Sequence, residues 1–313
     1  MRISKVMTFV LSFALLSAGA AFAAPAKKAA KAKPVTITVV EMTGNANGSQ
    51  EEGLNEGLKQ FIGGEVEIVK VDREAALKDP KYKGLNMDYM PLYLVEKTKV
   101  TEEKFAEPIK YGQLAVTDDF IVFEKQTRHG VYANKEAVPN QLEIFVMSQC
   151  PYGVLAENRI IDAMKLDKLP KDVNVNIRYI VSEGRNGQEF NSLHGAAEWE
   201  ENVRQLIIKN KYPKKFWKYL EIRNKNYQSS LWDQAAEQAG INPKVFRKYW
   251  NEGVKMLKEE IKHAEEYNVN GSPTVIWEGR VVTDMGSLAE IPGFEGLAQT
   301  YGSAAAQAPA GQC

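Results

Sequence analysis

The feature that most constrains the fold is a strand that runs directly into a proline-led helix. Residues Gln141–Met147 form an apolar, β-branched and aromatic run that is typical of a strand. After Ser148–Pro151, apolar residues recur at helical spacing as far as Met164. Pro151 suits a first helical turn because its missing N–H would have no partner there. The sequence therefore predicts a strand–turn–helix junction that places Cys150 at the positive end of a helix.

Both halves of the chain show a similar order of predicted elements. The first half reads as strand, helix, strand and two later strands, at 35–41, 54–62, 65–72, 92–95 and 120–124. The second half reads as strand, helix, strand, helical block, a proline-led strand pair and a short helix, at 141–147, 154–164, 173–180, 184–266, 274–277, 281–282 and 288–298. This order predicts two α/β units, each with one crossover helix.

The turn at the predicted helix start resembles a known active-site motif. Residues 150–153 read Cys-Pro-Tyr-Gly, which is similar to the Cys-Pro-Tyr-Cys motif of the thioredoxin superfamily. The resemblance implies that Cys150 is a nucleophile, and the helix dipole would favour its reactive thiolate form. Gly153 stands where the family has its resolving cysteine, so attack on a disulfide would stop at a mixed disulfide until an outside thiol arrives. The alternative is that Cys150 is a small buried apolar residue.

A proline-containing loop in the second half extends the resemblance. Residues 269–276 read Val-Asn-Gly-Ser-Pro-Thr-Val-Ile, similar to the loop that carries a cis-proline opposite the active cysteine in thioredoxin-like proteins. The resemblance implies that Ser272 and Pro273, together with Pro151 and Tyr152, bind an extended client peptide. An ordinary trans proline at a sheet edge is the alternative.

A second resemblance lies in the helical block. Four residues match the H-G-x-x-E-C-x-x-N signature of gamma-interferon-inducible lysosomal thiol reductases: His194, Gly195, Glu198 and Asn202. The cysteines of that signature are replaced here by Ser192, Trp199 and Ile207. Together the resemblances cover roughly residues 141–300 and imply a DsbA-like or reductase-like thioredoxin domain. We favour a hydrogen-bonding cluster that supports the insertion over direct proton transfer to Cys150, and both interpretations stay open.

The two ends of the chain differ in composition from the middle. Residues 1–23 have a basic start, a short apolar stretch and Ala-Phe-Ala, as in a signal peptide, which predicts an exported, periplasmic protein. Residues 24–34 form an Ala/Lys/Pro linker and residues 303–313 a low-complexity tail. Cys313 ends this tail, where it could resolve a Cys150 disulfide, pair between molecules or be incidental.

Composition excludes several classes of function. The formal net charge is +0, so nothing in the charge balance favours nucleic acid as a partner. Two cysteines and three separated histidines give no basis for a metal centre, and we expect no cofactor. Beyond the signal peptide, no apolar stretch is long enough for a membrane span.

These observations predict a cysteine-free thioredoxin-like domain at 35–138, followed by a thioredoxin-like domain at 139–302 with a helical insertion at 184–266. The first domain would lack a thiol, because Gly44–Ser49 stands where a cysteine motif would be. We expect an exported thiol–disulfide oxidoreductase or isomerase that acts on protein or peptide clients with an external thiol reductant or redox partner protein. The alternative is a catalytically impaired, chaperone-like scaffold that binds peptides.

Overall fold

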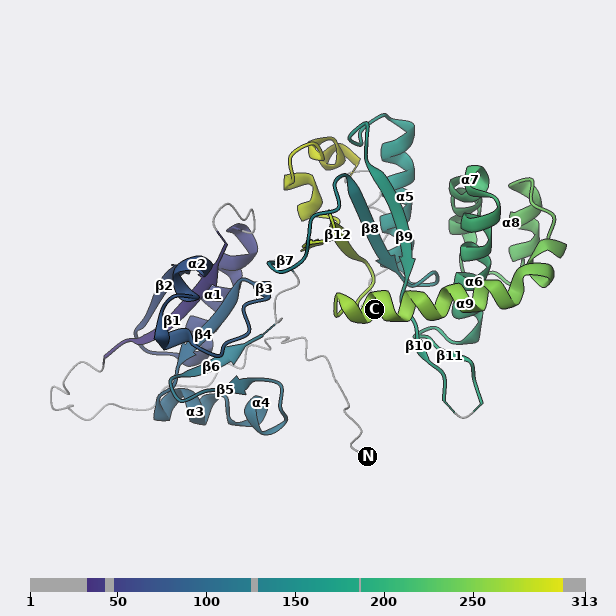
Figure 1. Cartoon of the computed structure of the whole chain (residues 1–313). Helices are drawn as coiled ribbons and strands as arrows, with labels where there is room; N and C mark the ends of the chain where they lie inside the picture. Colours follow the sequence, from purple (N-terminus) through teal and green to yellow (C-terminus); the bar gives the residue numbers. More distant parts are fainter. Residues whose placement is uncertain (1–32, 43–47, 125–128, 186, 301–313) are drawn as a thin grey trace, which may run out of the picture.

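The computed structural model describes residues 33–42, 48–124, 129–185 and 187–300 of the chain. The predicted signal peptide, nearly all of the predicted linker, and the predicted tail with Cys313 lie outside the described residues. The described part is a mixed α/β structure with a five-stranded sheet, a six-stranded sheet and a two-stranded hairpin (Figure 1).

The first half of the chain forms the five-stranded sheet, in the order β2-β1-β4-β6-β5. Its strands are β1 (Val35–Glu41), β2 (Val66–Asp72), β4 (Leu92–Glu96), β5 (Ala115–Val116) and β6 (Phe120–Phe123). Helix α1 (Gly48–Ile62) connects the parallel pair β1 and β2, and β4 pairs antiparallel with β1. Short helices complete this half: α2 (Arg73–Ala76), η1 (Pro80–Tyr82), α3 (Lys99–Lys104) and α4 (Ala106–Lys110).

The second half forms most of the six-stranded sheet, in the order β3-β7-β13-β12-β8-β9. Its strands are β3 (Tyr89–Met90), β7 (Gly130–Tyr132), β8 (Gln141–Val146), β9 (Asn174–Tyr179), β12 (Thr274–Trp277) and β13 (Val281–Thr283). Helix α5 (Pro151–Lys165) connects the parallel strands β8 and β9, and β12 pairs antiparallel with β8. Each half therefore has a parallel pair that is continued on one side by antiparallel strands, which confirms the predicted thioredoxin-like fold class.

Two short strands join the halves. β3 pairs antiparallel with β7, with Tyr89 opposite Tyr132 and Met90 opposite Val131, and β7 pairs with β13. Residues that precede the predicted domain boundary at 138 thus belong to the second sheet. The boundary itself stays a prediction, because sheet membership alone does not divide the chain into independently folding units.

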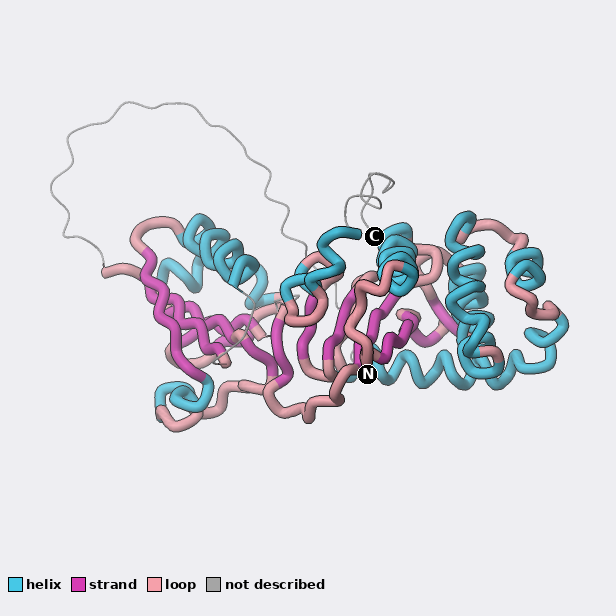
Figure 2. The backbone as a smooth tube through the Cα atoms, turned by 90° about the horizontal axis from the view of Figure 1, so that it is seen from above, coloured by secondary structure: helices cyan, strands magenta, loops and turns pink. Residues whose placement is uncertain are grey.

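The insertion lies on the side of the second sheet that faces away from the first half (Figures 1 and 2). A hairpin that the sequence analysis missed leads into the insertion, and helices follow. The elements are β10 (Ser182–Glu183), β11 (Phe190–Asn191), α6 (Ala196–Lys211), α7 (Pro213–Arg223), η2 (Asn224–Asn226), α8 (Trp232–Gln238) and α9 (Lys244–Glu266). The predicted helix at 288–298 is instead two 3₁₀ turns, η3 (Ser287–Glu290) and η4 (Glu295–Thr300), because Pro292 cannot continue a helix.

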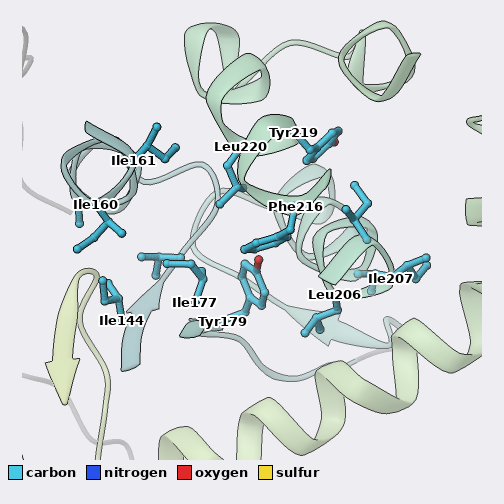
Figure 3. Packing of buried hydrophobic residues seen from close by; sticks show 14 of the residues in the cluster. Ile144, Ile160, Ile161, Ile177, Tyr179, Leu206, Ile207, Phe216, Tyr219 and Leu220 are labelled. Atoms are coloured by element: carbon cyan, nitrogen blue, oxygen red, sulfur yellow. The ribbon is translucent and has the colours of Figure 1, made fainter. Parts of the chain in front are cut away.

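Alternate residues of β8 face two different cores. Ile144 and its neighbours Leu142 and Val146 pack with α5 and the insertion, in the cluster drawn in Figure 3. Phe145 packs on the opposite face, against Tyr267 and Ala264 near the end of α9. β8 is therefore buried on both faces, as expected for a sheet covered by helices on each side.

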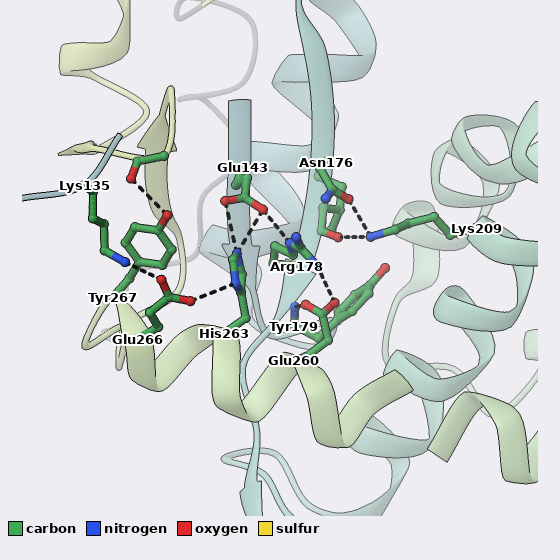
Figure 4. A network of polar contacts seen from close by, with 12 residues as sticks. Lys135, Glu143, Asn176, Arg178, Tyr179, Lys209, Glu260, His263, Glu266 and Tyr267 are labelled. Atoms are coloured by element: carbon green, nitrogen blue, oxygen red, sulfur yellow. Dashed lines mark hydrogen bonds and ion pairs between the residues drawn. The ribbon is translucent and has the colours of Figure 1, made fainter. Parts of the chain in front are cut away.

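A buried ionic network fixes α9 to the second sheet (Figure 4). Glu143 on β8 accepts a hydrogen bond from Arg178 Nε at 2.6 Å and lies 3.1 Å from His263 Nε2. Arg178 also donates to Glu260 at 3.0 Å, and Glu260 accepts from the backbone N–H of Tyr179 at 3.1 Å. Burial opposes ionisation of Glu143, but His263 and Arg178 hold its pKa below the ordinary value. The long helix is thus anchored under the sheet by charge as well as by apolar packing.

Helices α6 and α9 lie close together at Gly253, which gives a first prediction. A Cβ atom at this position would lie 2.8 Å from Cγ1 of both Val203 and Ile207. We expect Gly253→Ala to lower the free energy of unfolding by ~1–3 kcal/mol, because overpacking forces the helices apart. Urea unfolding measures this. The matched control is Gly57→Ala in α1, where a Cβ meets nothing within 4 Å and helix propensity should raise stability. Equal effects of the two substitutions would contradict the packing explanation.

Candidate active site

Cys150 is the N-cap residue of α5, as the sequence predicts. Its backbone is extended, with φ −75° and ψ 123°, and Pro151 begins the helix. The Cys150 N–H donates to Met147 O at 2.9 Å, and the Cys150 carbonyl accepts from Val154 N at 2.9 Å. These two hydrogen bonds close the turn between β8 and α5, so the thiol group is held beside the unpaired N–H groups at the start of the helix.

Ser272, two residues before β12, contacts this turn. The Cys150 thiol lies 3.7 Å from the Ser272 carbonyl oxygen, and Ser272 Oγ accepts from Met147 N at 3.0 Å. The peptide bond between Ser272 and Pro273 is cis. The structure therefore brings Cys150, Ser272 and Pro273 together, although they are separated by more than a hundred residues of sequence. Pro151 and Tyr152 are half-buried at the same end of α5.

The sulfur atom is buried. Cys150 is 0% exposed, and the two residues before it, Ser148 and Gln149, are 2% and 6% exposed. A client disulfide cannot reach Cys150 in this arrangement, so any reaction requires the turn to move. The location of Cys150 at the start of a helix is the one expected for a nucleophile, whereas its burial is what the alternative of a small buried apolar residue predicts.

The predicted supporting cluster of His194, Glu198 and Asn202 contacts the turn through Glu198. Glu198 is fully buried near the start of α6 and accepts a hydrogen bond from Gln149 N at 3.0 Å. His194 Nδ1 lies 2.7 Å from the same carboxylate. Asn202, one helical turn further along α6, is buried, and neither polar atom of its side chain has a hydrogen-bond partner among the described residues. Sequence reasoning found this cluster but not its direct bond to Gln149.

Another buried carboxyl, Glu157, lies on α5 and was missed by the sequence analysis. It accepts a hydrogen bond from Asn224 Nδ2 at 2.8 Å. Burial raises the pKa of Glu157 to about 8; the Asn224 bond opposes this shift and the charge of Glu201 adds to it. An acidic residue within an otherwise apolar helical stripe was the available signal, because such a residue must either point outward or be neutral inside.

Within the described ranges, no three histidine, cysteine, aspartate or glutamate residues are grouped so that they could hold a metal ion. None of the helices in those ranges combines the length and apolar character needed to cross a membrane.

No protein-family profile matches the chain, and no curated protein matches it. Among solved structures, it is similar to ScsC of Proteus mirabilis in a transitional conformation, with 15% identity and a TM-score of 0.38 over 53% of this chain and 71% of that one. It is also similar to DsbA of Pseudomonas aeruginosa, with 18% identity and a TM-score of 0.38 over 55% and 87% of the two chains. A third similar structure is the DsbA disulfide interchange protein of Klebsiella pneumoniae, with 18% identity and a TM-score of 0.36 over 54% and 89%.

The close packing of Gly153 against Ser272 gives a second prediction. A Cβ at residue 153 would lie 2.6 Å from Ser272 Oγ and 3.1 Å from Met147 O. We expect Gly153→Cys to destabilise the reduced protein by ~1–3 kcal/mol, because the hydroxyl occupies the space of the added Cβ. Adding Ser272→Ala removes that hydroxyl, so the double variant should lose less stability than the sum of the single variants, by at least ~0.5 kcal/mol.

Urea unfolding with a reductant present measures this double-mutant cycle. Gly153→Ala is the control: it adds the Cβ without a thiol and should cost about as much as Gly153→Cys. Strict additivity of the two substitutions would show that Gly153 and Ser272 do not compete for space.

The raised pKa of Glu157 gives a third prediction. The native state holds this proton more tightly than the unfolded chain, where the value is near 4.5, so the stabilisation is complete below 4.5 and is lost as the pH rises to about 8. Glu157→Gln should therefore flatten the fall in unfolding free energy across that window. Glu221→Gln is the control, because Lys165 and Lys218 lower the pKa of Glu221 and its effect lies at more acidic pH. An unchanged slope in Glu157→Gln would contradict the assignment.

Proposed function

We propose that the protein is a thiol–disulfide oxidoreductase or isomerase that acts on protein or peptide disulfides through Cys150. The observation that supports this proposal is the position of the thiol at the N-terminus of α5, 3.7 Å from the carbonyl that precedes Pro273. The backbone at Ser272 can also pair with an extended client, because β12 begins only at Thr274.

The proposed reaction begins with attack of the Cys150 thiolate on one sulfur of a client disulfide. A bond forms between Cys150 and that sulfur, the client S–S bond breaks, and the other client sulfur leaves as a thiolate that takes up a proton. In isomerisation, a different client thiolate attacks the client sulfur of the mixed disulfide. This step makes a new client disulfide and releases Cys150, with no net oxidation.

Net reduction of a client needs an outside partner, because Gly153 supplies no second thiol. A first thiol of an external thiol reductant or a redox partner protein would attack the Cys150 sulfur of the mixed disulfide, and the reduced client would leave as a thiolate that takes up a proton. A second thiol would then attack the reductant's sulfur in the resulting mixed disulfide, so that the reductant is oxidised to a disulfide and Cys150 is released. Cys313 is the other cysteine of the chain and could take this resolving role. The predicted signal peptide supports export to the periplasm, where such exchange partners operate.

The second candidate function is a peptide-binding or chaperone-like scaffold. The complete burial of Cys150 favours it, because a buried thiol reacts slowly. A scaffold would keep the surface around Ser272 and Pro273 for an extended peptide without using the sulfur.

The two functions predict different behaviour of Cys150→Ser. When wild-type protein is incubated with an unfolded protein that contains scrambled disulfides, we expect mixed disulfides on a non-reducing gel, because attack stops at that stage. Cys150→Ser should form none, since the hydroxyl cannot replace the thiolate. Cys313→Ser is the matched control and should still form them.

Mixed disulfides that persist in Cys150→Ser but vanish in Cys313→Ser would overturn the assignment of the nucleophile. If neither wild type nor variant forms them and all three proteins bind the unfolded protein equally, the scaffold function is favoured instead.

A further inference from the structure

The insertion holds both residues that precede the thiol through a single residue, Glu198. Ser148 Oγ donates to the Glu198 backbone carbonyl at 3.2 Å, and Gln149 N donates to Glu198 Oε1 at 3.0 Å. Glu198 is 0% exposed, and its partners are almost as deeply buried. The backbone of the turn is thus tied to α6, although the two segments are about fifty residues apart in sequence.

The Glu198 carboxylate is itself held in place from the outer side. His194 N donates to Oε2 at 3.1 Å, and His194 Nδ1 lies 2.7 Å from Oε1. The His194 side chain is 23% exposed, so it separates the carboxylate from solvent. Hydrogen bonds to a carboxylate are stronger than those between neutral groups, and they are stronger still away from water.

The turn is thus fixed by partners from two different segments of the chain. Ser272 binds it on the β12 side, through Met147 N and the thiol, and Glu198 binds it on the α6 side, through Ser148 and Gln149. The Ser272 contact is also where an extended client would pair. Movement that exposes the sulfur while Ser272 keeps its bond to Met147 N must therefore release the Glu198 side.

We propose that Glu198 is a positioning residue that acts as a latch: its hydrogen bonds to residues 148 and 149 keep Cys150 closed, and their release exposes the sulfur to disulfides. The proposal rests on the thiol function of Cys150. It assigns to the insertion control of access to the thiol, which differs from a purely structural role and from proton transfer.

The test measures the rate at which iodoacetamide alkylates Cys150 in the full chain under native conditions, with Cys313→Ser as the common background. Glu198→Ala should raise this rate about tenfold or more, because a charge-assisted hydrogen bond no longer opposes opening. Glu198→Gln keeps an oxygen that can accept from Gln149 N, so its rate should lie between those of wild type and Glu198→Ala.

Glu201→Gln is the matched control. Glu201 is equally buried on the same helix, but its partners are Arg204, Gln205, Tyr219 and Arg223 of the insertion itself. This variant should lose stability in urea while the alkylation rate changes less than about twofold, because the turn keeps its hold. Hydrogen exchange at the Gln149 amide provides a second readout, which should accelerate in Glu198→Ala and not in Glu201→Gln.

The latch and the proposed function can fail separately. An alkylation rate in Glu198→Ala within twofold of wild type, or an equal rise in Glu201→Gln, would overturn the latch while leaving mixed-disulfide formation by the wild type untouched. If Glu198→Ala is alkylated faster but forms no mixed disulfide with oxidised glutathione, the latch is supported and the thiol function fails.

Discussion

The structure depends most on how the turn between β8 and α5 is held. A strand buried on both faces ends at Val146, and α5 begins only five residues later at Pro151. The intervening backbone groups must find partners in a buried environment, where an unpaired N–H costs free energy comparable to a lost hydrogen bond. Ser272 supplies one partner and Glu198 another, and these residues come from segments on opposite sides of the turn. The position of the thiol is thus a consequence of satisfying the turn.

The requirement that buried polar groups have partners also explains the buried charges around the second sheet. Glu143 has a cationic or hydrogen-bonding partner on each side, so it can stay ionised at the centre of β8 and draw α9 against the sheet. Among the described residues, the hydrogen-bond donor to Glu157 is the amide of Asn224, and burial raises the pKa of Glu157 to about 8, which keeps it neutral at pH 7. The carboxylate of Glu143 thus binds its partners through charge, and the neutral carboxyl of Glu157 binds its partner through an uncharged hydrogen bond. Both connect the sheet and its crossover helix to the insertion, which also packs against them through apolar side chains.

Sequence patterns predicted the elements whose signals are local. The strand at 141–147, the proline-led helix and the strand after Pro273 follow from periodicity and from proline chemistry, and they place Cys150 beside Ser272. The two- and three-residue strands β3 and β7 have too few residues for any period, so their pairing could not be foreseen. The partners of Glu143 lie 35 and 120 residues away, and only the folded chain brings them together. The prediction of a helix at 288–298 was wrong, because the proline within this segment interrupts a helix even where apolar residues recur at helical spacing.

The two halves use one strand order for different purposes. In the second half, the residue before Pro273 faces a thiol, and the first turn of α5 approaches it so closely that only a glycine fits at residue 153 without a shift. In the first half, the two residues before Pro91 already pair with β7 and so join the sheets. The backbone before Pro91 is therefore used as a joint between the sheets, whereas Ser272 lies before the first residue of β12. The same strand order thus places Cys150 beside the residue that precedes the proline in the second half, and a contact between the two sheets beside the proline in the first half.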